Sequence, residues 1–257
     1  MPFHYAIGFA VLFGATIGSF LNVVIHRLPL GQSVVRPRSR CPHCSWMIPA
    51  WANIPILSYV ALRGRCWSCS APISLRYPLV EALTAVVFVG VLWVAPSYTR
   101  LFAHWALGAA LVAVAFIDLD HKIIPNSITL PGIVIGMALA FVDPPPGPLD
   151  ALLGVLIPAG LMFAIAEIYE RRSGAIGLGM GDVKLVAMLG AFLGVQAGFG
   201  IMVLGSLLGI VHGLIMMLFA GAGRRTRIPF GPALCLAGLF HIYDPMLFPG
   251  LIERLLP

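Results

Sequence analysis

The chain has 257 residues, of which 60% are hydrophobic and only 10% are charged, and its mean hydropathy is +0.97. A soluble domain carries roughly 25% charged residues, so this composition excludes an ordinary soluble protein and indicates a polytopic membrane protein. The net charge of +6 does not indicate a nucleic-acid-binding protein, because no basic patch alternates with stacking aromatic residues.

Long apolar runs predict an all-α polytopic membrane protein with about eight transmembrane helices. A span needs about 20 apolar residues, or fewer where helices tilt or break, so run length is the criterion. The first run lacks a small-residue cleavage site and is followed by an arginine-rich segment, which favours a retained helix over a removed leader. The expected spans are residues 5–25, 79–95, 102–118, 127–142, 150–168, 183–198, 200–220 and 230–247.

Basic residues predict the orientation of these helices, because cytoplasmic loops of membrane proteins retain Lys and Arg. All but two of the 16 Lys and Arg residues fall on one side of the predicted topology, and Arg100 and Arg254 fall on the other. An even number of spans then places both termini outside and the arginine-rich loops in the cytoplasm. We expect three domains: a first span at 1–26, a cytoplasmic insert at 27–78 and a membrane core at 79–257.

The insert carries two cysteine pairs, Cys41-Pro-His-Cys44 and Cys66-Trp-Ser-Cys69. Two CxxC turns can supply four thiolates to a tetrahedral Zn²⁺, although the interval between them slightly exceeds the usual spacing of about 15–20 residues. A reducing cytoplasm argues against disulfides; redox dithiols and unliganded thiols are the alternatives. We expect a structural zinc on Cys41, Cys44, Cys66 and Cys69, which staples a domain too small for a substantial core.

Two aspartates stand where long apolar runs meet polar loops. Asp118 follows the apolar run 111–117, and Asp182 closes the sequence Gly-Met-Gly-Asp before the next run. A carboxylate at such a border is costly, so its presence indicates function. In the predicted topology both aspartates lie at the cytoplasmic border, where their side chains could meet.

A pair of carboxylates is suited to peptide hydrolysis. One ionised carboxylate takes a proton from water, while the other, protonated, donates to the scissile carbonyl oxygen. Two close like charges share one proton, because both do not ionise readily together. Helix dipoles favour charge on Asp182 and the neutral form of Asp118, which suggests Asp182 as base and Asp118 as acid. The simpler alternatives are an N-cap role for Asp182 and an interface role for Asp118 or Asp120.

Further motifs accompany the two aspartates along nearly the whole chain. They occupy residues 18–29, 39–44, 53–59, 62–66, 76–81 and 228–232. Together they make the chain resemble the prepilin peptidases, the type IV leader peptidase family of bacterial membrane aspartic proteases. The first aspartate of the family matches Asp118, in preference to Asp120, and the second matches Asp182. Where some relatives carry another acid, after the proline, this chain has Asn126.

The resemblance implies a multi-pass enzyme of the bacterial inner membrane whose active site faces the cytoplasm. Its expected partners are type IV prepilins and pseudopilins, together with membrane lipid. It implies cleavage of their short basic leader after a Gly, then methylation of the new N-terminal amine with S-adenosylmethionine. Members with a cysteine-bearing insert tend to be bifunctional. No Rossmann fingerprint follows a predicted strand, so no residue is assigned to cofactor binding.

Three other functions stay open at this stage. The first is a peptidase alone, in which the cysteine domain only docks the substrate. The second is a proton-coupled transporter that uses intramembrane carboxylates, although we find no inverted repeat. The third is a non-catalytic scaffold for pilus assembly.

Overall fold

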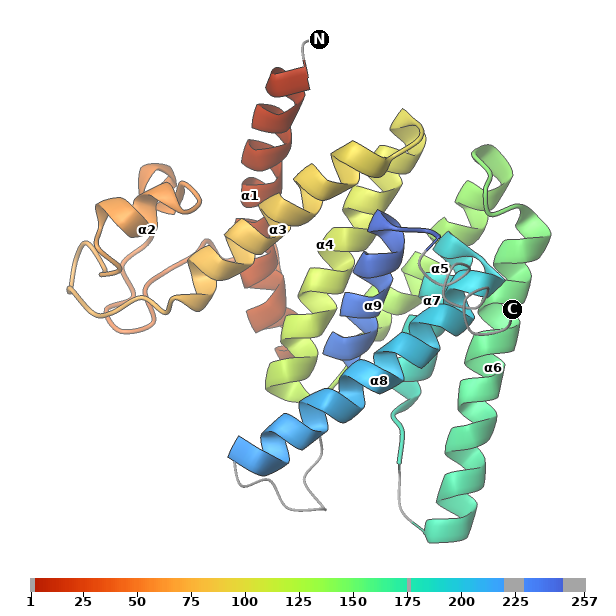
Figure 1. The fold of residues 1–257 in the computed structure, drawn as a ribbon. Helices are drawn as coiled ribbons and strands as arrows, with labels where there is room; N and C mark the ends of the chain where they lie inside the picture. Colours follow the sequence, from red (N-terminus) through yellow and green to blue (C-terminus); the bar gives the residue numbers. More distant parts are fainter. Residues whose placement is uncertain (1–2, 175–176, 220–228, 247–257) are drawn as a thin grey trace. The chain divides into compact units, whose positions relative to one another are not determined.

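The structure is a computed structural model that describes residues 3–174, 177–219 and 229–246 (Figure 1). Within these residues it is helical, with two isolated β-bridges and no strand. Four arginines of the predicted topology and the first residue of the last motif lie outside the described residues, namely Arg224, Arg225, Arg227, Arg254 and Ile228. The chain divides into two compact units, residues 1–113 and 114–257.

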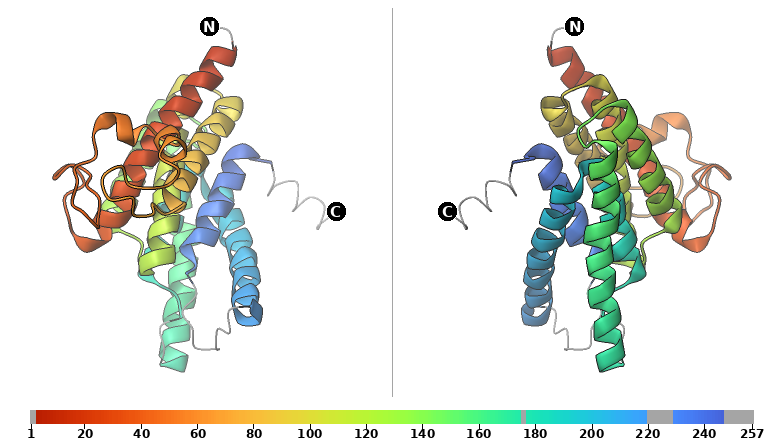
Figure 2. Two further views of the ribbon diagram at one scale, coloured as in Figure 1. Left: turned by 90° about the vertical axis from the view of Figure 1, so that its left-hand side faces the viewer. Right: turned by 90° about the vertical axis from the view of Figure 1, so that its right-hand side faces the viewer.

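The first unit is built on two apolar helices whose backbones touch. They are α1 (Phe3–Arg27) and α3 (Arg76–Val94), which lie side by side (Figures 1 and 2). A Cβ added at Gly14 would lie 2.7 Å from the Cα of Ala85, and one at Gly18 would lie 2.6 Å from the Cα of Glu81. Small residues at these positions therefore allow the close helix contact that is typical of membrane helices.

An aromatic cluster joins these two helices to the first part of α4 (Tyr98–His121). The rings of Phe88 and Trp105 stack at 5.0 Å, and Phe13 lies 5.7 Å and 5.6 Å from them. The Trp105 indole N–H donates to the Phe88 carbonyl at 2.8 Å, so its polar group is satisfied inside the core.

The polar insert between α1 and α3 contains only short helices. These are η1 (Leu28–Leu30), η2 (Ala50–Asn53) and α2 (Leu57–Ala61). Loops and two CxxC turns make up the rest, as expected for a segment with few apolar residues to bury.

In the second unit the other helices surround one short helix, α7. It contains the end of α4 and the helices α5 (Asn126–Val142), α6 (Pro148–Ser173), α7 (Met180–Leu193), α8 (Val195–Phe219) and α9 (Gly231–Tyr243). Helix α7 contacts α5, α6, α8 and α9, and most of its residues are buried. Its Gly190 meets the backbone of Gly154 on α6, with no room for a Cβ. From Leu185 onward α7 is apolar on every side, as expected of a helix that is surrounded by protein.

Among the described residues, five helices are long and apolar enough to cross a membrane: α1, α3, α4, α6 and α8. Helices α5 and α9 are shorter apolar helices, and α7 has only 14 residues. The eight predicted spans correspond in order to these eight helices, which confirms an all-α multi-pass membrane protein with a small cysteine-bearing insert. The number of crossings itself stays a prediction.

Several predicted spans differ from the observed helices at their ends, and glycine explains one of these differences. Helix α7 begins at Met180 instead of 183, and it ends at Leu193 instead of 198 because Gly194 has φ 90° and breaks the helix. Helix α4 continues beyond Asp118 to His121, and Lys122, with φ 55°, follows it. Asp118 therefore lies inside the last turn of α4.

Candidate active site and cysteine cluster

Asp118 is held by the start of α9. Its side chain is 6% exposed, and its Oδ2 accepts a hydrogen bond from the backbone N–H of Gly231 at 2.8 Å. A Cβ added at Gly231 would lie 2.8 Å from the same oxygen, which is too close for an unstrained contact. The glycine therefore lets the α9 backbone approach the carboxyl group. Gly231 belongs to the motif at residues 228–232, but the sequence alone predicts no role for it.

Asp182 lies in the first turn of α7 and is 9% exposed. Its Oδ2 accepts a hydrogen bond from the backbone N–H of Gly179 at 3.3 Å. Gly179 is the N-cap residue, and Asp182 stands at the third helical position, where its carboxylate bonds back to the N-cap N–H as in one half of a capping box. The alternative in which Asp182 is itself the N-cap residue is therefore wrong, because Gly179 occupies that position.

One small cavity brings the two aspartates together. It has a volume of about 240 Å³, enough for several water molecules. Its lining is formed by the ends of α4 and α7 and the segment between α4 and α5: Asp118, Lys122, Ile123, Ile124, Gly179, Gly181 and Asp182. Gly181 allows this packing, because a Cβ there would lie 2.9 Å from the Cβ of Ile124. Asp120 is exposed and is not part of the lining.

A lysine and an amide link two helices next to this cavity. The Lys184 ammonium donates to the Asn126 Oδ1 at 2.9 Å, which connects α7 to the first residue of α5. Asn126 stands at the position after the proline where, by the resemblance, another acid could have been expected. The amide oxygen there accepts a hydrogen bond from the lysine and adds no third negative charge to the two aspartates.

The four insert cysteines form a compact cluster. All four Sγ atoms lie within 4.8 Å of one another, with 3.8 Å between Cys41 and Cys69 and 4.0 Å between Cys44 and Cys66. The cluster could hold a metal ion such as zinc, which prefers four thiolate ligands in a closed site. The fifth cysteine, Cys235, is buried in α9, as expected of a small apolar side chain.

The two CxxC turns use the same backbone hydrogen bonds. In the first turn the N–H of Cys41 donates to Trp46 and the N–H of Ser45 donates back to Cys41, both at 2.9 Å. In the second, Cys66 donates to Ala71, and Ser70 donates to Cys66, at the same distance. The two serines have nearly equal positive φ values of 57° and 58°. Each turn is therefore an equivalent half of the cluster.

Local backbone polarity favours metal binding by at least one of these sulfurs. A hydrogen bond from the backbone N–H of Trp46 lowers the pKa of the Cys44 thiol. The hydrogen bond from the N–H of Ala71 acts in the same direction on Cys69, but burial and the three neighbouring thiols outweigh it and raise the pKa of Cys69 to about 12. A lower pKa favours the thiolate, which is the form that binds metal ions.

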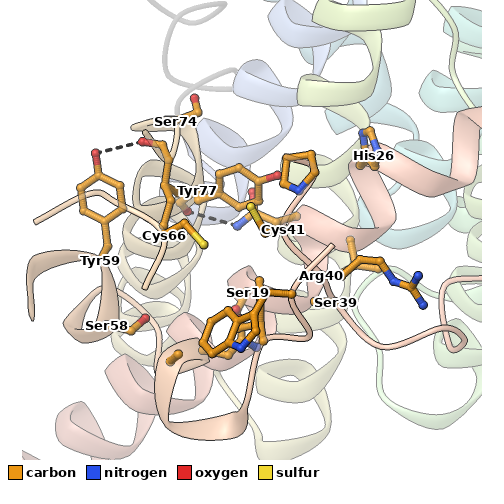
Figure 3. A pocket seen from close by; sticks show the side chains of 18 of the residues that line it. Ser19, His26, Ser39, Arg40, Cys41, Ser58, Tyr59, Cys66, Ser74 and Tyr77 are labelled. Atoms are coloured by element: carbon orange, nitrogen blue, oxygen red, sulfur yellow. Dashed lines mark hydrogen bonds between the residues drawn. The ribbon is translucent and has the colours of Figure 1, made fainter. Parts of the chain in front are cut away.

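A second, larger cavity of about 850 Å³ lies in the first unit, between the insert and the adjoining ends of α1 and α3. Ser19 and His26 of α1, Tyr77 of α3 and the insert residues Cys41 and Tyr59 lie around it (Figure 3). This cavity was not predicted from the sequence, because its walls come from segments that are distant in the chain.

Comparison with known proteins identifies the family. Residues 12–95 match the family described as "Bacterial Peptidase A24 N-terminal domain", and residues 105–214 match the "Type IV leader peptidase family". A prepilin leader peptidase/N-methyltransferase from Myxococcus xanthus is 46% identical over 236 residues, which cover 88% of this chain and 69% of the relative. The chain belongs to the type IV leader peptidase family.

Other members of the type IV leader peptidase family cover the chain to a similar extent. A prepilin leader peptidase/N-methyltransferase from Aeromonas hydrophila is 41% identical, over 88% of this chain and 87% of its own length. One from Stutzerimonas stutzeri is 38% identical, over 89% and 87%. No solved structure is significantly similar. These matches confirm the resemblance drawn from the motifs.

Proposed function

We propose that the chain cleaves the short basic leader of type IV prepilins and pseudopilins and then methylates the new N-terminal amine. The observation that carries this proposal is the joint position of Asp118 and Asp182 in one cavity. The relatives named prepilin leader peptidase/N-methyltransferase, which align over most of this chain, support both activities.

The two aspartates act as a pair that shares one proton. One carboxylate takes a proton from a water molecule, and the protonated partner donates to the carbonyl oxygen of the scissile peptide. The N-terminus of α7 favours charge on Asp182, whereas the N–H of Gly231 favours charge on Asp118. Because these effects oppose each other, the proton belongs to the pair, and its titration is a property of both groups.

The proposed setting is the bacterial inner membrane, with the aspartate cavity at the cytoplasmic face. The excess of Lys and Arg in the loops on that side supports this orientation. A cytoplasmic site also fits the substrate, since a leader that has not crossed the membrane meets the enzyme there.

Zn²⁺ is the metal that we propose for the cysteine cluster. In a tetrahedral site with Zn–S bonds of about 2.3 Å, the sulfurs are about 3.8 Å apart, close to the observed 3.8 Å and 4.0 Å. Cys41, Cys44, Cys66 and Cys69 would hold the ion. Four thiolates leave no open position, so the metal's role is structural: it joins the two CxxC turns.

S-adenosylmethionine is the proposed methyl donor, and the 850 Å³ cavity is large enough for it. When bound, it supplies an electrophilic methyl group. Arg40 lines the cavity, and a guanidinium can pair with the carboxylate of such a molecule through two parallel hydrogen bonds.

An assay on detergent-solubilised prepilin tests the proposal. The wild-type protein should release the leader, and with S-adenosylmethionine the product should gain one methyl group, both read by mass spectrometry. Asp118→Asn and Asp182→Asn should each reduce cleavage by at least about 100-fold, because each removes one partner of the acid–base pair. Asp120→Asn is the matched control and should cleave at a rate near wild type.

Other outcomes would contradict this function. Substantial cleavage by either amide variant would exclude the paired mechanism. Normal pilus assembly by the Asp118/Asp182 double variant would favour the non-catalytic scaffold. Cleavage without any methyl transfer would leave a peptidase alone.

A further inference from the structure

The large cavity of the first unit contains a buried acid that proteolysis does not use. Glu81 of α3 is 7% exposed and, among the described residues, is the only acidic one that lines this cavity. The other charged groups in the lining are basic, and they are Arg27, Arg36 and Arg40. A buried carboxylate is costly unless it is bonded, and one that faces a cavity indicates a ligand of opposite charge.

Glu81 is fixed by a strained turn of the insert. Its Oε2 accepts a hydrogen bond from the backbone N–H of Ile56 at 2.7 Å, and the Ser19 side chain bonds the same carboxyl group. Ile56 has φ 61° and ψ −49°, and the N–H of Leu57 donates to the Pro55 carbonyl at 2.6 Å. This tight turn is rare for a β-branched residue, and such strain collects at functional sites.

The close contact between α1 and α3 holds Glu81 rigidly. Gly18 of α1 allows the backbone of that helix to lie against the Cα of Glu81. One turn further along α1, the Asn22 side-chain amide donates to the Tyr77 carbonyl of α3 at 3.1 Å. Because α3 is locked against α1, the Glu81 carboxylate on α3 has the precision that a site needs. An ionised carboxylate can accept about four hydrogen bonds, so these contacts leave room for a ligand.

We propose that Glu81 binds the N-terminal ammonium group of the cleaved protein and accepts its proton, as the general base of N-methylation. This inference rests on the proposed methyltransferase function. An α-amino group has a pKa of about 7.7–8.0 and is mostly protonated near neutral pH, so it has no free lone pair. Transfer of that proton to Glu81 leaves a neutral amine.

The reaction then balances without a further reagent. The amine lone pair forms the new N–C bond to the methyl group of the donor, and the methyl–sulfur bond breaks. The electron pair of that bond stays on sulfur, which becomes a neutral thioether. The product is a secondary ammonium ion, and Glu81 returns its proton to water.

The cavity favours the cleaved amine over the uncleaved leader. A leader with several positive charges meets arginines on most of the charged wall, whereas a single ammonium finds one carboxylate. Trp46, Tyr59 and Tyr77 also line the cavity and suit an apolar side chain next to the amine. Methylation therefore follows cleavage, because cleavage both removes the leader and creates the amine.

A binding experiment tests the contact between Glu81 and the amine. The full-length protein is titrated with a labelled peptide that matches the cleaved N-terminus, either with a free amine or N-acetylated. Glu81→Gln keeps the size of the side chain and an acceptor for the Ile56 N–H but removes the charge. We expect it to weaken binding of the free-amine peptide about tenfold and to leave binding of the acetylated peptide unchanged.

A rate experiment tests the proton transfer. Methylation of the same free-amine peptide should fall at least about 100-fold in Glu81→Gln, while retention of labelled S-adenosylhomocysteine and leader cleavage show that the protein is folded. Glu167→Gln is the matched control, because Glu167 pairs with Arg171 away from both cavities. Its methylation rate should equal that of the wild type.

The outcomes separate a chemical role from a structural one. If Glu81→Gln methylates normally while Glu81→Ala does not, Glu81 only anchors the insert and the inference is wrong. Equal weakening of both peptides by Glu81→Gln would also overturn it. If the wild-type protein methylates neither peptide, the methyltransferase function itself fails, and this result is distinct from the other two.

Discussion

The shape of the Asp118 site depends on a residue that carries no side chain. Gly231→Ala would bring a Cβ within 2.8 Å of the Asp118 Oδ2 and push the carboxyl group away from its backbone donor. Because a shift of about 1 Å in a catalytic group can cost about 100-fold in rate, we expect kcat/KM for leader cleavage to fall about 10- to 100-fold. Steady-state cleavage of a labelled prepilin measures this.

Gly160→Ala provides the comparison for this prediction. A Cβ at Gly160 of α6 meets nothing within 4 Å, so the substitution should leave cleavage unchanged. If Gly231→Ala also cleaves normally, the backbone approach of α9 to Asp118 has no catalytic importance.

Single residues were predictable where their chemistry conflicts with their surroundings. Asp118 and Asp182 interrupt apolar runs, so the sequence alone marks them, and the structure brings both to one cavity. The contributions of Gly231 and Glu81 were not predictable in the same way. Each depends on a partner from a distant segment, Asp118 for the first and Ile56 for the second, and the spacing of residues does not reveal such contacts.

At the level of elements, the two CxxC turns depend on each other through the cluster between them. Purified protein should contain about one zinc per chain, and Cys41→Ser should lose most of it, because three thiolates do not close the tetrahedral site. The insert of such a variant should be cut by protease much faster than that of the wild type, since metal binding and folding are coupled in small domains. Metal analysis and limited proteolysis measure these two effects.

Cys235→Ser distinguishes the loss of a ligand from the loss of any thiol. Cys235 lies in α9, outside the cluster, so its variant should keep the metal and the protease resistance of the insert. Full zinc content in Cys41→Ser would show that the cluster is not the metal site.

Helices were predictable in type and order but not at their ends. Apolar run length predicts each helix, whereas the ends depend on local backbone details, such as the break at Gly194 and the capping box of Gly179 and Asp182. The backbone conformation that the two CxxC turns share was also not predictable from the sequence. It rests on Ser45 and Ser70 adopting positive φ, a conformation that glycine or asparagine adopts more readily.

For the whole molecule, the two cavities imply two separable activities. The aspartate cavity lies in the second unit and the Glu81 cavity in the first. Loss of cleavage should therefore not abolish methylation of a peptide that already has a free N-terminus. With the uncleaved substrate, methylation depends on cleavage but cleavage does not depend on methylation, because methylation needs the amine that cleavage releases.

The proposed position of the aspartate cavity at the cytoplasmic face depends on the number of membrane crossings. Helices α7 and α9 have only 14 and 13 residues, fewer than the roughly 20 that a straight span needs. We still expect eight crossings and an external C-terminus, because bundle helices packed against longer neighbours can be short. A C-terminal alkaline phosphatase fusion to the full chain should be active, and a C-terminal green fluorescent protein fusion should be dark.

The opposite reporter pattern would mean either an odd number of crossings or an inverted topology with both termini in the cytoplasm. The aspartates would then still share a side, because α5 and α6 between them return the chain to the face where α4 ended. A cysteine at the exposed position 145, in the loop between α5 and α6, separates the remaining possibilities. Its labelling on intact cells by a membrane-impermeant maleimide would place that loop outside and the aspartate cavity at the cytoplasmic face. Labelling only after permeabilisation would place the cavity on the external face, which a cytoplasmic leader does not reach.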